Sequence, residues 1–111
     1  ICYSDLSKIN LLGVSTDLIN EKSSVSEDVC FEMAKNFRNK FSSDFSIATT
    51  GYAGPTGGTE DNPVGTVFIT INSSKGSITE KILFSGDRKI ILNQVKIKAL
   101  ELLVDEIKKY E

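Results

Sequence analysis

Apolar residues recur at helical spacing between positions 6 and 41 of this chain. Residues 6–12 suit a short helix that ends at Gly13, a favoured stop signal, and a second short helical turn follows. A longer helix is expected to begin after Ser24 or Ser26, where acidic residues follow at the positive end of the helix dipole. One apolar stripe repeats at every fourth position of this helix: Val29, Met33, Phe37 and Phe41. The first third of the chain is therefore predicted to be mainly helical.

Four segments carry the apolar pattern of β-strands. Residues 1–4 are interpreted as the end of a strand, and residues 45–49 as a buried strand. Residues 67–71 and 78–84 form two further runs, and the link at 72–76 has the composition of a turn. We therefore expect an α/β protein whose sheet includes an antiparallel hairpin.

A long helix is expected from Asp87 to about Tyr110. Its first apolar stripe consists of Ile91, Val95, Ala99, Leu102 and Leu103. Its second stripe consists of Ile90, Ile97, Leu100 and Val104. Packing on one sheet face needs only one stripe, so part of this helix is expected to pack on another subunit of a homo-oligomer.

Length and charge narrow the class of protein. The chain has 111 residues and a formal net charge of −2. This length suits one domain that folds alone, and this charge gives no basic footprint for nucleic acid or an anionic membrane. No apolar run reaches the length that spans a membrane. Cys2 and Cys30 are interpreted as buried free thiols, which fits a reducing, cytoplasmic location.

The sequence contains no histidine. A Ser-His-Asp or Cys-His arrangement within this chain is therefore excluded. Without histidine or a cysteine cluster we expect no metal site, and no cofactor is expected either. Any acid–base group must be a carboxylate, a lysine, a tyrosine or a hydroxyl.

The densest cluster of unusual residues follows the strand at 45–49. Five of the eight glycines and both prolines lie between Gly51 and Gly65, which indicates a loop of specified shape. Ligands of open α/β sheets bind at such strand ends. The candidate substrate-binding residues here are Thr50, Gly51, Ala53, Gly54, Gly57 and Gly58. The alternative is a long connecting loop without a ligand.

Three further residues are chemical candidates. Tyr3 and Lys8 flank the first strand–helix junction, and a lysine whose pKa is lowered by burial can accept a proton there. The alternative is a surface tyrosine and a solvated lysine. Arg88 lies at a later strand–helix junction and suits a carboxylate or a phosphate. Its alternative is an ion pair with Asp87 or Glu80.

Several segments carry a resemblance to a known family, in order and along almost the whole chain. They are Tyr3-Ser-x-x-x-Lys8, Leu11-Leu-Gly-Val14, Val25-Ser-Glu27, Met33-Ala34, Thr50-Gly-x-Ala-Gly-Pro-x-Gly-Gly58, Pro63-Val-Gly-Thr-Val67 and Phe84-x-Gly-Asp-Arg88. The chain resembles the C-terminal domain of the competence-damage-inducible protein CinA, the family of nicotinamide-nucleotide amidases. The resemblance implies a three-layer α/β/α sandwich with a mixed sheet. It also implies deamidation of nicotinamide mononucleotide to nicotinic acid mononucleotide and ammonia, without a metal.

The resemblance further implies a division of roles. The family's nucleophile is a serine in a Ser-Cys-Thr-Gly-Gly segment that precedes the strand with which this chain begins. Residues 1–111 are thus expected to be a single domain that lacks its N-terminal strand and the nucleophile-bearing helix. Lys8, tuned by Tyr3, would accept the serine proton and return it to ammonia. Backbone N–H groups of residues 50–54 would hold the oxyanion or the ribose phosphate, with Arg88 as an anion contact.

Two positions depart from the family pattern. Tyr52 stands where an aliphatic residue is usual, and Leu92 stands where many members carry a second arginine. Two other interpretations stay open beside the amidase. One is a non-catalytic nucleotide-binding module that retains the glycine loop, and the other is an interaction domain that uses the second stripe of the last helix.

Overall fold

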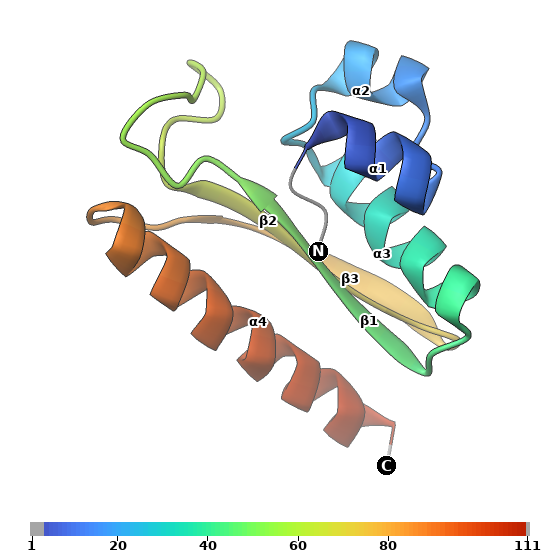
Figure 1. The fold of residues 1–111 in the computed structure, drawn as a ribbon. Coiled ribbons are helices and arrows are strands. Elements are labelled where there is room, and N and C mark those ends of the chain that lie inside the picture. Colours follow the sequence, from blue (N-terminus) through green and yellow to red (C-terminus); the bar gives the residue numbers. More distant parts are fainter. Residues whose placement is uncertain (1–3, 111) are drawn as a thin grey trace.

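The computed structural model describes residues 4–110. Its elements in chain order are α1 (Asp5–Leu12), α2 (Thr16–Lys22), α3 (Glu27–Phe41), β1 (Phe45–Gly51), β2 (Thr66–Ser73), β3 (Gly76–Leu83) and α4 (Arg88–Lys109). Figure 1 shows three layers, with α1, α2 and α3 on one face of the sheet and α4 on the other. The expected α/β class and its three-layer arrangement are confirmed.

The sheet has the order β1-β2-β3, and both pairs of neighbours are antiparallel. Ile47 lies opposite Ile71, and Ile71 in turn lies opposite Ile78. The hairpin predicted from residues 67–84 is therefore present. A mixed sheet would need a parallel strand in addition to these three. The strand expected at residues 1–4 lies outside the described residues except for Ser4. The backbone of Ser4 is extended and leads into α1.

β2 is the central strand, and all of its residues are buried. Alternate side chains of a strand point to opposite faces, so β2 contributes to two separate cores. Phe68 packs in the α3-side core with Val29, Met33 and other residues of the first three helices. Ile69 packs in the α4-side core with Ala99 and Leu102. Burial of apolar side chains on both faces therefore fixes the layers.

Side-chain caps set where the helices begin. Ser26 is the N-cap of α3, because its Oγ accepts a hydrogen bond from Val29 N. Asp87 caps α4 in the same way through Ile90 N. Gly13 ends α1, as predicted, and adopts the left-handed conformation. Of the two serines considered for the start of α3, Ser26 is the cap.

The apolar stripes of the two long helices are only partly used for packing. Phe41, at the end of the α3 stripe, is exposed and lies against the ring of Phe37 at a centroid distance of 4.6 Å. In α4 the first stripe faces the sheet, as predicted. The second stripe is exposed; its members are Ile90, Ile97, Leu100 and Val104. The separation of the two stripes is thus confirmed, while their expected use in a subunit contact stays a prediction.

Candidate functional site

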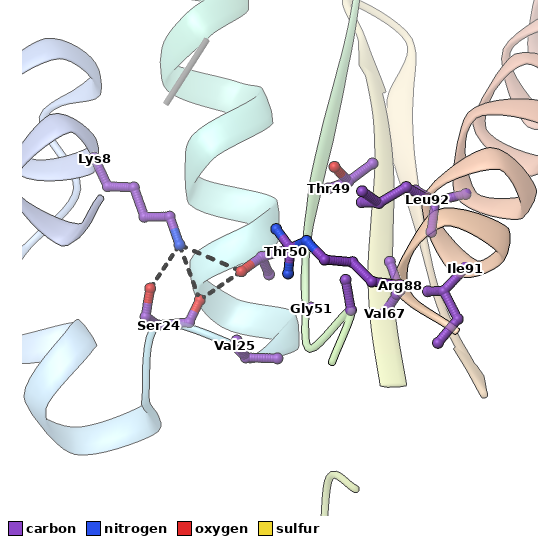
Figure 2. A pocket seen from close by; sticks show the side chains of 12 residues that line it. Lys8, Ser24, Val25, Thr49, Thr50, Gly51, Val67, Arg88, Ile91 and Leu92 are labelled. Atoms are coloured by element: carbon purple, nitrogen blue, oxygen red, sulfur yellow. Dashed lines mark hydrogen bonds between the residues drawn. The ribbon is translucent and has the colours of Figure 1, made fainter. Parts of the chain in front are cut away.

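A pocket of about 400 Å³ lies at the end of β1, between the layer of α1 and α3 and the layer of α4. Figure 2 shows residues of both layers around it. Its lining consists of Lys8, Ser24, Val25, Thr49, Thr50, Gly51, Ala53, Val67, Arg88, Ile91, Leu92 and Val95. The Lys8 side of the pocket is rich in hydroxyl groups, and the α4 side is mostly apolar.

Lys8 is buried in α1, with 6% of its surface exposed, although lysine is usually solvated. Its Nζ donates hydrogen bonds to Ser24 Oγ at 2.5 Å, to Thr50 Oγ1 at 3.3 Å and to the Ser24 carbonyl oxygen at 3.4 Å. Figure 2 shows the amine pointing into this group of oxygens. The alternative of a solvated Lys8 at the surface does not hold.

Thr50 lies near the end of β1, where successive side chains point to opposite faces of the sheet. Its hydroxyl faces the α3 side and donates a hydrogen bond to the Ser24 carbonyl oxygen at 2.9 Å. The hydrogen of this hydroxyl is thus directed at Ser24, and its oxygen accepts from Lys8. Thr50 thereby fixes both the lysine and the chain segment that carries Ser24.

The glycine-rich loop between β1 and β2 folds back on itself. Gly65 N donates to the Tyr52 carbonyl oxygen at 2.6 Å, and Tyr52 N donates to the Thr66 carbonyl oxygen at 3.0 Å. Positive φ values of 86°, 92° and 84° occur at Gly54, Gly57 and Gly58. Side chains disfavour such backbone angles, so the loop has the specified shape that its composition indicated.

Arg88 is the first residue of α4 and connects this helix to the loop. Its Nη1 donates a hydrogen bond to the Gly54 carbonyl oxygen at 3.1 Å. The carboxylate of Asp87 is used as the helix N-cap. Ile91 and Leu92 follow on the same side of the pocket, so an apolar wall stands where many family members are expected to carry a second arginine.

The structure brings most of the predicted site residues together. Lys8, Thr50, Gly51, Ala53 and Arg88 all line the one pocket. Gly54 adjoins it through the hydrogen bond of its carbonyl oxygen to Arg88. The other two loop glycines, Gly57 and Gly58, are not among its lining residues. Tyr3 lies outside the described residues.

Sequence reasoning missed the role of Ser24. It considered this serine only as a possible cap for α3, and Ser26 is the cap. Ser24 instead makes two contacts with Lys8, through its hydroxyl and its carbonyl oxygen. The 16-residue separation of Lys8 and Ser24 gives no local signal, because the contact depends on how α1 and the start of α3 pack.

Other chemistry is limited in the part of the chain that the structure describes. Residues 4–110 hold no group of three or more His, Cys, Asp or Glu that could bind a metal ion. None of their helices is long and apolar enough to cross a membrane. Cys30 is a buried free thiol, as predicted, and burial raises its pKa from 9.0 to about 11. Cys2 lies outside the described residues.

Comparison with known proteins decides the family. The family model of the CinA C-terminal domain matches residues 1–107. This chain belongs to the CinA C-terminal domain family. It is 41% identical over 109 residues to a CinA-like protein of Flavobacterium psychrophilum, covering 98% of this chain and 26% of that protein. It is 40% identical over 103 residues to a CinA-like protein of Geobacter sulfurreducens, covering 93% of this chain and 25% of that protein. The chain thus spans about a quarter of the length of these curated relatives.

Crystal structures of CinA proteins have the same fold. The competence damage-inducible protein A of Klebsiella pneumoniae matches with a TM-score of 0.92 at 31% identity, over 98% of this chain and 68% of that one. A CinA superfamily protein of Enterobacter cloacae matches with a TM-score of 0.88 at 36% identity, over 95% of this chain and 62% of that one. The fold expected from the resemblance is therefore shown for this CinA domain.

Proposed function

We propose that this CinA domain is part of an amidohydrolase that converts nicotinamide mononucleotide to nicotinic acid mononucleotide and ammonia. The observation that carries the proposal is the buried Lys8 amine, held against two hydroxyl groups at the wall of a pocket. A buried lysine among hydroxyls is a suitable proton acceptor for a serine nucleophile. The pocket volume of about 400 Å³ lies in the range of small-molecule sites.

The proposed reaction uses groups from this chain and one group from a segment that precedes it. A serine hydroxyl of that segment attacks the carboxamide carbon, and Lys8, tuned by Tyr3, takes up the serine proton. The proton then passes to the leaving ammonia, and water completes the hydrolysis of the acyl-enzyme. Backbone N–H groups near Thr50 and Gly54 stabilise the oxyanion or bind the ribose phosphate, and Arg88 binds the anion. We place this chemistry in the cytoplasm, without metal or cofactor.

Substitution of Lys8 tests this function in a protein that carries this domain together with the serine segment. Lys8→Ala should lower the turnover of nicotinamide mononucleotide by roughly 10² to 10⁴ with little change in KM, because a general base acts in the transition state. Lys8→Arg should not restore it, since arginine stays protonated. Ammonia release is the measurement, and residues 1–111 alone should release none above the blank.

Lys40→Ala is the matched control for the Lys8 variants. Lys40 is an exposed lysine that donates to the carbonyl oxygen of Leu11, and neither residue lines the pocket. This variant should keep normal turnover. Near-normal turnover of Lys8→Ala would make Lys8 a structural residue and would contradict the proposal.

A second candidate function is an interaction domain, and the exposed stripe of α4 favours it. Ile97 and Leu100 are 60% and 58% exposed, and they lie on a face that no other described element covers. Such an apolar face is typical of a contact with another subunit. Sedimentation equilibrium is the test: the unaltered chain should form a homo-oligomer, and Leu100→Glu should shift it to the monomer. If both the unaltered chain and Leu100→Glu are monomers, the function as an interaction domain is excluded.

A further inference from the structure

The hydroxyl group of Ser24 contacts the Lys8 amine at the pocket that both residues line. Ser24 lies in the short link between α2 and α3, and its Oγ is 2.5 Å from Lys8 Nζ, the shortest of the three contacts of that amine given above. Ser24 is half-buried and Lys8 is buried, and both residues line the pocket. Figure 2 shows dashed lines from the Lys8 amine to the oxygens of Ser24 and to the Thr50 hydroxyl.

The three contacts of Lys8 described above differ in what they can do with a proton. The Ser24 carbonyl oxygen has none to give. Thr50 has one, but it donates this hydrogen to the same carbonyl oxygen at 2.9 Å. The Ser24 hydroxyl accepts from Lys8, and its own hydrogen is donated to no acceptor within residues 4–110. A serine hydroxyl can rotate and can both accept and donate, so it can pass a proton between Lys8 and the pocket.

Hydrogen bonds hold the backbone of the segment that carries this hydroxyl. Ser26 Oγ donates to the Ser23 carbonyl oxygen at 2.8 Å, and Val25 N donates to Ser23 Oγ at 3.2 Å. The hydrogen bond from Thr50 fixes the Ser24 carbonyl group itself. The residue is therefore preorganised by bonds on both sides, which is the condition for an efficient proton transfer.

We propose that Ser24 Oγ relays the proton between Lys8 Nζ and the reacting groups in the pocket; this rests on the function proposed above. As the nucleophile attacks, its O–H proton passes to Ser24 Oγ, while the Ser24 proton passes to the Lys8 amine and forms an ammonium. In the reverse direction an ammonium proton passes to Ser24 Oγ, and the Ser24 proton passes to the departing nitrogen, which leaves as ammonia. Both steps leave the serine unchanged.

The test compares Ser24→Ala with Ser24→Thr in the protein that carries the serine segment. Ser24→Ala should lower kcat for nicotinamide mononucleotide by roughly 10² to 10⁴, as expected for a lost acid–base group, with KM within about threefold of normal. Ser24→Thr keeps a hydroxyl and should recover most of the rate. In mixtures of light and heavy water, the unaltered protein should show the curved rate dependence of a two-proton transfer.

Ser26→Ala is the matched control, because it weakens the same segment without touching the pocket. It should lower the melting temperature but keep kcat. Equal losses of kcat in Ser24→Ala and Ser26→Ala would assign the effect to folding of the segment and overturn the relay. Normal turnover of Ser24→Ala beside an inactive Lys8→Ala would overturn the relay alone, whereas no turnover by the unaltered protein would overturn the proposed function as well.

Discussion

Arg88 holds the glycine-rich loop and lines the pocket with the same side chain. Its guanidinium group holds the loop by donating to the Gly54 carbonyl oxygen, and the same residue lines the pocket. Arginine has five N–H donors in a planar fork. One of these donors binds the Gly54 carbonyl oxygen of the loop. The planar guanidinium group also has the geometry that suits a phosphate. A ligand phosphate at this position would therefore join α4, the loop and the pocket.

Arg88→Ala should raise KM for nicotinamide mononucleotide by about tenfold or more, because a charge-assisted hydrogen bond to the phosphate is worth roughly 1.5–3 kcal/mol. Nicotinamide riboside, which lacks the phosphate, should lose much less. Steady-state kinetics on both substrates is the measurement, with Arg88→Lys as the charge-conserving control. Equal losses on both substrates would mean that Arg88 acts only by holding the loop.

At the level of elements, the loop between β1 and β2 has the most constrained backbone near the site. A Cβ at Gly54 would lie 2.7 Å from Val64 Cγ1, and one at Gly57 would lie 3.1 Å from Tyr52 Cδ1. Both glycines have positive φ, so a side chain at either position strains the loop. The two glycines differ in one respect: the carbonyl oxygen of Gly54 accepts a hydrogen bond from Arg88, which lines the pocket.

Gly54→Ala and Gly57→Ala should each lower the free energy of unfolding by about 1 kcal/mol or somewhat more. Gly54→Ala should also weaken the binding of nicotinamide mononucleotide, because it displaces the carbonyl oxygen that Arg88 contacts. Gly57 does not line the pocket, so Gly57→Ala is the control and should bind almost normally. Thermal unfolding and calorimetric titration measure the two effects. If a folded Gly54→Ala variant binds nicotinamide mononucleotide with unchanged affinity, the loop only connects β1 to β2 and does not contribute to binding.

The elements themselves were largely predictable from the sequence, because each carries a local signal. The period of apolar residues gave the helices, alternation and a turn gave the hairpin, and Gly13 and Asp87 marked helix ends. Contacts between elements were not predictable in the same way. The burial of Lys8 against Ser24 and Thr50 depends on the packing of three distant segments, and a regular stripe did not reveal that Phe41 would be exposed.

At the scale of the whole molecule, the pocket is assembled from both outer layers and from the sheet between them. Lys8 comes from α1, Thr50 from β1 and Arg88 from α4. A stable arrangement of all three layers is thus a condition for the site. The global free energy of unfolding therefore matters to function, and a buried titratable group can make that free energy depend on pH.

Cys30 should make the domain less stable at high pH. Burial raises the pKa of its thiol from 9.0 to about 11, so between these values the unfolded chain loses a proton that the folded chain keeps. The free energy of unfolding then falls as pH rises, by up to about 3 kcal/mol from this group, at 1.36 kcal/mol for each pKa unit. The contribution is fully present below pH 9.0.

Urea unfolding at pH 8 and pH 10.5 measures this loss. Cys30→Ala should be less stable at both values because it leaves a small cavity, but its loss between them should be smaller than that of the unaltered chain. All other titrating groups are the same in the two proteins and cancel in the comparison. Equal losses would show that the Cys30 thiol ionises as readily in the folded protein as in the unfolded one.

The complete burial of β2 has a consequence for how this domain can change in evolution. A hydrogen-bonded strand separates the two cores, so a volume change on one side is not compensated from the other. Phe68 and Ile69 are adjacent in sequence but belong to different cores, and they can vary independently. Phe68 and Met33 are far apart in sequence but share a core, so their sizes are coupled. Positions that covary in the interior of this domain should therefore lie in adjacent layers that share one core. Within β2, residues two positions apart should covary more than adjacent residues.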